Sequence, residues 1–209
     1  MPRIYVASLS DYNNGILHGA WIDAAQDADN IRAEIAAMLR ESKYPNVEVD
    51  CPKDGVLCPF GTFDDGTRSP CPMCGGTGKV PSAEEYAIHD YEDFEGISLG
   101  ESEDLDRVAA LASALEEHGG AFAAWYENGT ASDDPTDWAE EFADAYAGEW
   151  NSLEAYAEEL LDDMGTFQNM PDMLRNYFDM DAYARDLVLG GDVWTAKTPD
   201  FNVWVFRNI

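Results

Sequence analysis

The sequence predicts an α+β protein, with strands and helices in separate parts of the chain. Short runs rich in β-branched and aromatic residues, which are typical of strands, lie near both ends. Apolar residues at helical spacing dominate the middle. A net charge of −30 would favour disorder if hydrophobicity were low, but 45% of the residues are hydrophobic and 12% are aromatic. We therefore expect a folded protein.

The first hundred residues predict three strands and one helix, interrupted by an insert. Residues 4–9 predict a strand, residues 11–15 a turn and residues 16–22 the returning strand. A helix is expected over 27–40, because its apolar residues recur at i, i+4, i+7 and i+8. Residues 86–91 alternate enough to form another strand of the same region.

The insert, from about residue 45 to residue 82, has a different composition. It contains six prolines, six glycines and no apolar periodicity, so we expect a loop or a small module. All four cysteines of the chain lie in it. Because the chain shows no secretion signal, cysteines gathered in one short window favour metal binding over a disulfide framework.

One part of the insert has a recognisable cysteine motif. Cys71-Pro72-Met73-Cys74-Gly75-Gly76-Thr77-Gly78 resembles one knuckle of the zinc domain in DnaJ-type chaperones, in which glycines relieve the strain of a tight turn. A second Cys-x-x-Cys is missing, since six residues separate the other two cysteines. Four thiolates still suit tetrahedral zinc. The prediction is structural zinc bound by Cys51, Cys58, Cys71 and Cys74, with uncoordinated thiols or a disulfide as alternatives.

Negative charge is concentrated outside the insert. Residues 81–209 carry 31 acidic and 5 basic residues, and the stretch from Val108 to Leu174 contains no lysine or arginine. An ordinary surface mixes both signs. A concentrated negative field attracts a positively charged partner and repels nucleic acid. A merely solvated acidic face and a salt-adapted surface are the alternatives.

Helices are expected along most of this acidic region. The first begins near Ser102 and ends at Gly119-Gly120. The second begins at Asp134-Pro135, which resemble an N-cap and a first helical position. Its buried side is predicted to consist of large and small apolar residues at helical spacing, namely Trp138, Phe142, Ala145 and Tyr146.

The last sixty residues predict two helices and a hairpin. Asn151 with Glu154 resembles a capping box for a helix that ends at Gly165. Residues 171–177 predict a connector or a short helix, and Asp181 can cap a last helix through Leu187. Residues 193–206 predict a hairpin, in which we expect Val203, Val205 or Phe206 to contribute to a core or a dimer contact.

Carboxylates on two of the predicted helices repeat at i,i+4, where side chains lie about 5–6 Å apart. Each like-charge pair costs about 0.2–0.5 kcal/mol of helix stability, and a purely structural role does not require that cost. Ordered carboxylates can instead imitate the phosphates of a nucleic-acid backbone. The pairs are Asp137–Glu141, Glu140–Asp144, Glu154–Glu158, Glu158–Asp162 and Glu159–Asp163.

The predicted partner-binding surface combines these side chains with acidic residues at both ends of the preceding helix. It is called the acidic array below. It consists of Glu103, Asp104, Asp106, Glu116, Glu117, Asp137, Glu140, Glu141, Asp144, Glu154, Glu158, Glu159, Asp162 and Asp163.

Several blocks of the sequence resemble the ArdA antirestriction proteins. The opening, Ile4 to Leu9 followed by Asp11-Tyr12-Asn13-Asn14-Gly15 and His18-Gly19-Ala20-Trp21-Ile22-Asp23, is similar to the start of that family. So are residues 84–92, and residues 174–177 and 181–187 are similar to the family's end. The resemblance covers most of 1–44 and 83–209. It does not extend to the segment from about Tyr44 to Ser82.

The resemblance implies a function and an architecture. Members of the family are DNA mimics that occupy the DNA-binding groove of type I restriction–modification enzymes and inhibit them without catalysis. The expected target is the methyltransferase core. The expected form is an elongated homodimer with three lobes per chain, near 1–101, 102–149 and 150–209, dimerising through the C-terminal part. Such proteins are carried by bacterial mobile genetic elements and act in the cytoplasm of the host cell.

Other function classes receive little support from the sequence. We find no membrane span, no signal peptide and no phosphate-loop or serine-hydrolase motif. The three histidines, His18, His89 and His118, are far apart in the sequence. The dipeptide His89-Asp90 alone is weak evidence for acid–base catalysis. We therefore expect no enzyme, and no cofactor besides the zinc. The alternative function is an acidic binding module or chaperone for another basic protein.

Overall fold

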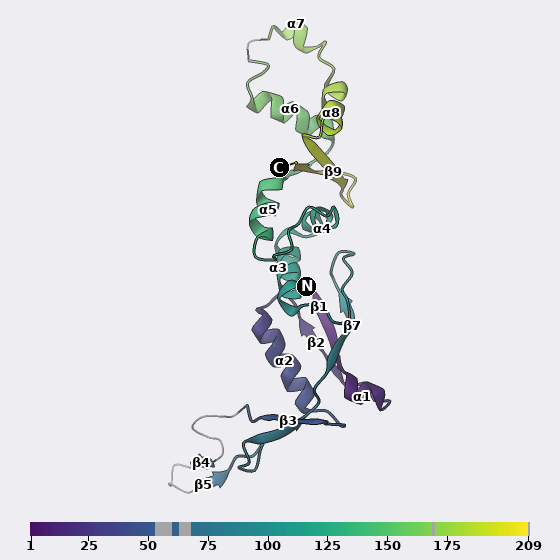
Figure 1. Cartoon of the computed structure of the whole chain (residues 1–209). Coiled ribbons are helices and arrows are strands. Elements are labelled where there is room, and N and C mark those ends of the chain that lie inside the picture. Colours follow the sequence, from purple (N-terminus) through teal and green to yellow (C-terminus); the bar gives the residue numbers. More distant parts are fainter. Residues whose placement is uncertain (53–59, 63–67, 169, 209) are drawn as a thin grey trace. The chain divides into compact units, whose positions relative to one another are not determined.

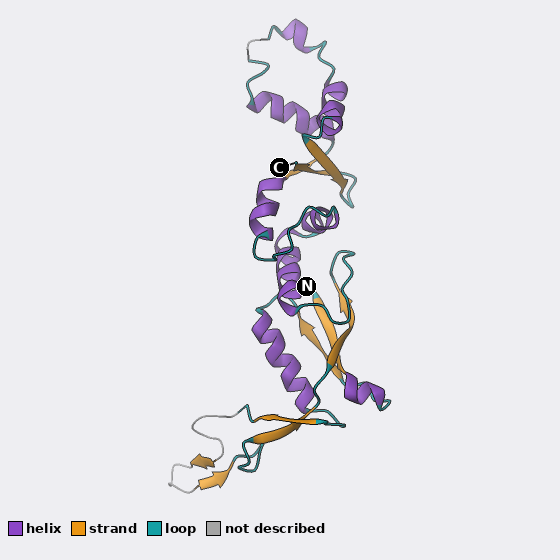
Figure 2. Ribbon diagram, in the orientation of Figure 1, coloured by secondary structure: helices purple, strands orange, loops and turns teal. Residues whose placement is uncertain are grey.

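The computed structural model describes residues 1–52, 60–62, 68–168 and 170–208, and it confirms the α+β class (Figure 2). The chain forms two compact units. Unit 1 consists of Met1–Phe94 and Ser98–Glu116, and unit 2 consists of Glu95–Ile97 and Glu117–Ile209. The division into three lobes stays a prediction.

Unit 1 contains a three-stranded antiparallel sheet covered by a helix (Figure 1). The strands β1 (Arg3–Ser8), β2 (Gly19–Asp23) and β7 (Tyr86–Glu92) lie in the order β2-β1-β7. Alternate residues of β1, Ile4 and Val6, are fully buried. The helix α2 (Ala28–Arg40) packs on β1 and β2 through its predicted apolar residues, and the Asp27 carboxylate accepts a hydrogen bond from the Asp29 N–H as its N-cap.

The predicted turn at 11–15 is wrong in part, because residues Leu9–Asn13 form the short helix α1. Ser8 caps this helix by accepting a hydrogen bond from the Asp11 N–H. The Asp11 side chain is completely buried and accepts hydrogen bonds from the Ser42 hydroxyl and the Lys43 N–H. These partners lie thirty residues away, so local turn propensity could not reveal them. The returning strand consequently begins at Gly19 rather than at residue 16.

The insert, called the arm below (residues 45–82), contains strands that its composition did not predict. The strands β3 (Val47–Asp50) and β6 (Lys79–Ser82) form one antiparallel pair, and β4 (Phe60–Thr62) and β5 (Arg68–Pro70) form another. Among the described residues of the arm, the buried cluster consists of Cys51, Cys71, Cys74 and Val80, with Val49 packed against it. The arm therefore has a small core, made mainly of cysteine.

The helix α3 (Leu105–His118) belongs to unit 1 as far as Glu116. Its N-terminus differs from the prediction: the Asp104 carboxylate, not the Ser102 hydroxyl, accepts hydrogen bonds from the N–H groups of Asp106 and Arg107. The predicted end at Gly119-Gly120 is confirmed, but a second helix follows at once. Gly119 adopts φ +57°, which favours glycine, and a Cβ at Gly120 would lie 2.8 Å from the Trp204 ring.

Unit 2 combines helices with a second three-stranded sheet. The strands lie in the order β8-β10-β9, and β9 and β10 form the predicted hairpin. The elements are α4 (Gly120–Glu127), α5 (Trp138–Ala145), β8 (Tyr146–Trp150), α6 (Leu153–Asp163), α7 (Asp172–Arg175), α8 (Met180–Leu189), β9 (Val193–Lys197) and β10 (Val203–Arg207). Aromatic side chains fill the core, chiefly Phe122, Trp125, Trp138, Phe142 and Phe206.

Several boundaries in unit 2 differ from the predictions. The helix α4 was not predicted, and Tyr146 begins β8 instead of continuing the stripe of α5. The helix α6 is capped by Ser152, whose hydroxyl accepts a hydrogen bond from the Ala155 N–H, and α8 is capped by Asp179. These two caps lie one and two residues from the predicted ones, and α5 begins at Trp138 with Asp137 as its N-cap, not at Asp134-Pro135 as predicted. Backbone placement decides such a choice when adjacent polar residues are equally suitable.

Candidate functional site

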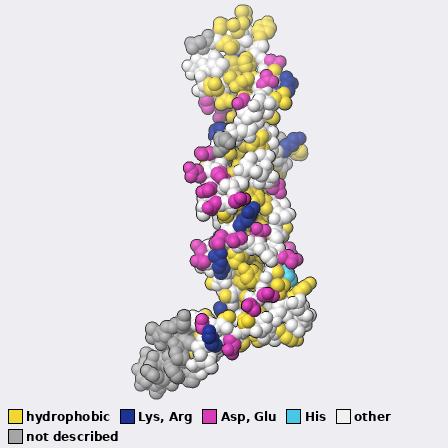
Figure 3. Space-filling model, in the orientation of Figure 1, with side chains coloured by type: hydrophobic (Ala, Val, Ile, Leu, Met, Phe, Trp, Pro, Cys, Tyr) yellow, Lys and Arg dark blue, Asp and Glu magenta, His cyan; other side chains and the backbone are white. Residues whose placement is uncertain are grey.

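The acidic array lies largely on exposed helical surface. All of its side chains are exposed except those of Glu103 and Glu141, which are half-buried. In unit 2, acidic side chains gather over α5, as Figure 3 shows in magenta. The helices α5 and α6 hold their carboxylates in place because Trp138, Phe142, Tyr156 and Leu161 anchor the opposite sides of these helices in the core.

Three members of the array near the N-terminus of α3 have structural partners. Arg32 Nη2 lies 2.6 Å from Asp106 Oδ2, and the hydrogen bond to Asp106 raises the pKa of Arg32. Glu103 accepts a hydrogen bond from the Gly100 N–H and lies 3.7 Å from Arg107 Nε. Asp104 caps α3. These three carboxylates are therefore either partly neutralised by an arginine or hydrogen-bonded to backbone N–H groups of unit 1.

Several carboxylates of α6 also have partners, which the absence of lysine and arginine between Val108 and Leu174 had not suggested. Arg175, one residue beyond the stretch without bases, lies 3.2 Å from Asp162 Oδ1 and 3.8 Å from Glu158 Oε1. It thus bridges one predicted like-charge pair. Trp150 Nε1–H donates to Glu159 Oε2 at 2.8 Å. Hydrogen bonds from Ser152 and from its own backbone lower the pKa of Glu154, so this carboxylate stays charged at neutral pH.

The carboxylates of α5 are less compensated. Among the described residues, no lysine or arginine forms an ion pair with Asp137, Glu140, Glu141 or Asp144. Glu141 Oε2 accepts a hydrogen bond from the Ser132 N–H at 3.0 Å, which fixes that side chain. The α5 surface is therefore the part of the array in unit 2 that best matches the expected unpaired carboxylates.

Three of the four predicted metal ligands come together in the arm. The sulfur atoms of Cys51, Cys71 and Cys74 all lie within 4.8 Å of one another, and those of Cys51 and Cys71 are 3.8 Å apart. All three residues are buried. Cys58, the fourth predicted ligand, lies outside the described residues. The cluster can bind a metal ion.

The turn around Cys71 and Cys74 is held by backbone hydrogen bonds. The Gly75 N–H donates to the Cys71 carbonyl at 2.8 Å, and the Thr77 N–H donates to the Cys74 carbonyl at 3.0 Å. Gly75 and Gly78 have φ of +61° and +76°, which only glycine adopts readily. The Cys51 N–H donates to the Gly78 carbonyl and thereby ties the first cysteine to the turn. The predicted knuckle is therefore an ordered turn of the arm.

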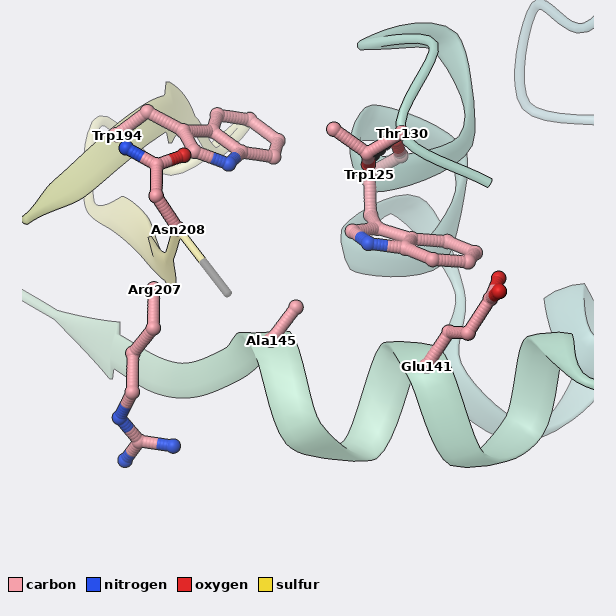
Figure 4. Close-up of a pocket in the computed structure, with 7 residues that line it drawn as sticks. All are labelled: Trp125, Thr130, Glu141, Ala145, Trp194, Arg207 and Asn208. Carbon is pink, nitrogen blue, oxygen red and sulfur yellow. Dashed lines mark hydrogen bonds between the residues drawn. The ribbon is translucent and has the colours of Figure 1, made fainter. Parts of the chain in front are cut away.

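A cavity of about 320 Å³ in unit 2 was not predicted from the sequence (Figure 4). Its residues come from distant parts of the chain, so no motif joins them. The residues that line it are Trp125, Thr130, Glu141, Ala145, Trp194, Arg207 and Asn208.

The histidines make structural contacts. His18 Nε2 lies 2.8 Å from the Met38 carbonyl oxygen, and His89 packs edge-on against Tyr12. The His118 ring lies 4.7 Å from the Phe142 ring, centre to centre. These contacts agree with the simple structural roles that are common for histidines at strand and helix positions.

Comparison with known protein families gives a match over most of the chain. The sequence model of the family described as "Antirestriction protein (ArdA)" matches residues 4–200. No curated protein matches the chain. Within the part of the chain that the structure describes, no helix has both the length and the apolar character needed to cross a membrane.

Proposed function

Because the chain belongs to the ArdA family of antirestriction proteins, which inhibit type I restriction enzymes and are not catalysts, we propose that it inhibits them by mimicking DNA. In this proposal the acidic array occupies the DNA-binding groove of the methyltransferase core. The observation that carries the proposal is the set of uncompensated, exposed carboxylates on α5, held by a rigid aromatic core.

The physical basis is competition for the same cationic groove. Duplex DNA presents one charge per about 1.7 Å of axis and gains affinity when basic residues release its counterions. Carboxylates at i,i+4 on a helix lie about 5–6 Å apart, so several helices together are needed to approach the charge density of DNA. A basic groove would bind the array for the same electrostatic reason.

The proposal is tested by competition. Purified protein should displace a fluorescent DNA duplex from a type I methyltransferase core. Direct binding of the protein to the core should weaken as salt rises from about 50 to 200 mM, because salt screens the two charged surfaces. Binding that leaves the DNA in place would contradict mimicry. In that case the protein would be an acidic module for another surface of a basic protein.

We also propose that the protein is a homodimer. Large apolar side chains are exposed in and around α7 and α8, among them Met173 at 70%, Tyr177 at 83% and Leu189 at 76%. Exposed apolar residues concentrated in one region are typical of an interaction site. Analytical ultracentrifugation of the wild type and of Leu189→Asp should show a dimer and a monomer respectively, whereas two monomers would contradict the proposal.

We propose further that the metal suited to the cysteine cluster is zinc, in a structural role. Zinc–thiolate bonds are about 2.3 Å long in tetrahedral sites, which places two sulfurs about 3.8 Å apart. The Cys51–Cys71 separation has this value, far above the roughly 2.05 Å of a disulfide bond. Three buried thiolates in one cluster favour zinc among the common divalent ions.

The zinc proposal is tested by metal analysis of purified protein. We expect one zinc per chain in the wild type and none in Cys71→Ser. The variant Cys58→Ser shows whether the predicted fourth ligand takes part, because after cobalt substitution the sulfur-to-cobalt charge-transfer band in the near ultraviolet grows with the number of thiolates. Wild-type protein purified without a chelator and lacking stoichiometric zinc would remove the proposal.

A further inference from the structure

The cavity in unit 2 has aromatic walls and a small floor. Trp125 comes from α4 and Trp194 from β9, and Ala145 of α5 lies below the space between the two indoles (Figure 4). The Trp194 ring is held from the other side by Phe206, with which it stacks at 4.1 Å and 13°. Trp125 is anchored in the aromatic core beside Phe122. Two indoles therefore line the cavity above a methyl side chain; Trp125 is 2% exposed, so the half-buried Trp194 offers the accessible ring.

The charged groups at this cavity point in different directions. The Glu141 carboxylate lies beside the Trp125 indole, and its hydrogen bond from the Ser132 N–H fixes it there (Figure 4). The Arg207 guanidinium is directed away from the two indoles and donates from Nη1 to the Asp144 carbonyl oxygen at 3.4 Å. The charge closest to the aromatic walls is consequently negative.

We infer that this cavity binds the guanidinium group of an arginine presented by the inhibited enzyme. The inference rests on the proposed function, because a DNA-binding groove is lined with basic side chains. A guanidinium gains from the faces of tryptophan rings and from a charge-assisted hydrogen bond to a carboxylate. It is also weakly hydrated and easily transferred into a half-buried site.

Charge complementarity excludes anionic occupants. Residues 117–209 carry 20 acidic and 4 basic residues, so a phosphate or a nucleotide would be repelled. Glu141 also differs from its neighbours on α5, because it is half-buried whereas Glu140 and Asp144 are exposed. Water and salt screen exposed charges more strongly than buried ones. Glu141 is therefore expected to contribute more to binding than an average member of the array.

Two matched substitutions on α5 test this difference. Glu141→Gln keeps the oxygen that accepts from the Ser132 N–H but removes the charge at the cavity. Glu140→Gln removes the same charge from the exposed side of the helix. We expect inhibition of the type I enzyme to weaken about tenfold in Glu141→Gln, as at an interface hot spot, and at most about twofold in Glu140→Gln. Equal losses in the two variants would overturn the inference and leave DNA mimicry intact.

A direct binding measurement needs no enzyme. A short arginine peptide should shift the indole N–H resonances of Trp125 and Trp194, and the same peptide with citrulline, which has nearly the same shape without charge, should not. Trp21, in unit 1, is the internal reference for non-specific attraction. In Trp194→Phe, which retains a ring to stack on Phe206, the shift of the remaining Trp125 resonance should disappear. Equal shifts at Trp21, or equal shifts with citrulline, would overturn the inference.

Discussion

The arm and the acidic helices of unit 2 are stabilised in opposite ways. The arm carries little net charge, since residues 45–82 contain five acidic and three basic residues, but its described core is little more than three cysteines and Val80. Unit 2 carries a large negative charge over a core of stacked aromatic rings. A module without an apolar core needs a metal or a disulfide, whereas a large aromatic core can tolerate repulsion at its surface.

The magnitudes support this comparison. Five like-charge pairs cost on the order of 1–2.5 kcal/mol, and one buried aromatic side chain offsets that cost, because its removal costs about 3–5 kcal/mol. A structural zinc site contributes about 10 kcal/mol or more in small peptides. The arm should therefore depend on one ion, and unit 2 on many packing contacts.

The largest effect is expected from removing the proposed metal ligand Cys74. Cys74→Ser, or chelation of the wild type, should abolish zinc binding and expose the arm to protease, because its described core then consists of Val80, Val49 and thiols that no longer share a metal ion. Limited proteolysis with mass spectrometry locates the cuts. The sheet β2-β1-β7 should remain protected. Cleavage across that sheet would mean that the metal stabilises the whole of unit 1.

The next largest effect is expected in the aromatic core of unit 2. Phe142→Ala removes a ring that is 2% exposed and contacts Phe122, Trp125 and Phe206. The free energy of unfolding should fall by about 3–5 kcal/mol, as measured by urea denaturation. Phe201→Ala, at a position that is 92% exposed, is the matched control and should change stability by less than about 0.5 kcal/mol. Zinc content should be normal in both variants.

A smaller effect is expected from the buried Asp11 of unit 1. Burial raises the pKa of Asp11, but hydrogen bonds from Ser42, Ser8 and the Lys43 N–H outweigh burial and lower it overall. Because the pKa is lower in the folded state, the stabilisation is complete above the unfolded pKa, about 3.9, and is lost as pH falls through the folded pKa.

Asp11→Asn tests this pH dependence. The variant should lose about 1–3 kcal/mol at pH 7, because hydrogen bonds to a charged acceptor are replaced. The difference from the wild type should shrink below about pH 4, where the unfolded carboxyl becomes protonated. Thermal melts between pH 3 and pH 7 measure both effects. A difference that is constant over this range would contradict the account.

The smallest effects on stability are expected from substitutions in the array. They should differ between α5 and α6. Replacing Asp137, Glu140 and Asp144 by amides should raise stability by about 0.4–1 kcal/mol, since two like-charge i,i+4 pairs disappear. Replacing Glu158, Glu159 and Asp162 should give no gain, because Arg175 and Trp150 lose their partners.

Both triple variants should weaken inhibition of the type I enzyme, because each removes three charges from the proposed surface. Urea denaturation and DNA competition on the same samples give the two readouts. If the α6 variant gained as much stability as the α5 variant, the ion pairs of Arg175 would contribute little to stability. Unchanged inhibition in both would place the recognition surface elsewhere.

Local periodicity was sufficient to predict the elements whose contacts lie near in the sequence. The helix α2 and the hairpin of β9 and β10 are confirmed, and Val205 and Phe206 are buried as expected for a core. The helices α1 and α4 and the strand β8 were missed. Asp11 draws its hydrogen bonds from residues 42 and 43, and β8 pairs with β10 more than fifty residues later. Such partners leave no local pattern.

The sequence by itself determined the charge, its concentration after residue 81, the cysteine knuckle and the membership of a family. These properties depend on composition and on short spacings. Only the tertiary structure decided which carboxylates are compensated, because Arg175 reaches α6 across a loop. It also decided which cysteines meet and that two indoles flank a cavity beside Glu141, since packing joins residues distant in the chain.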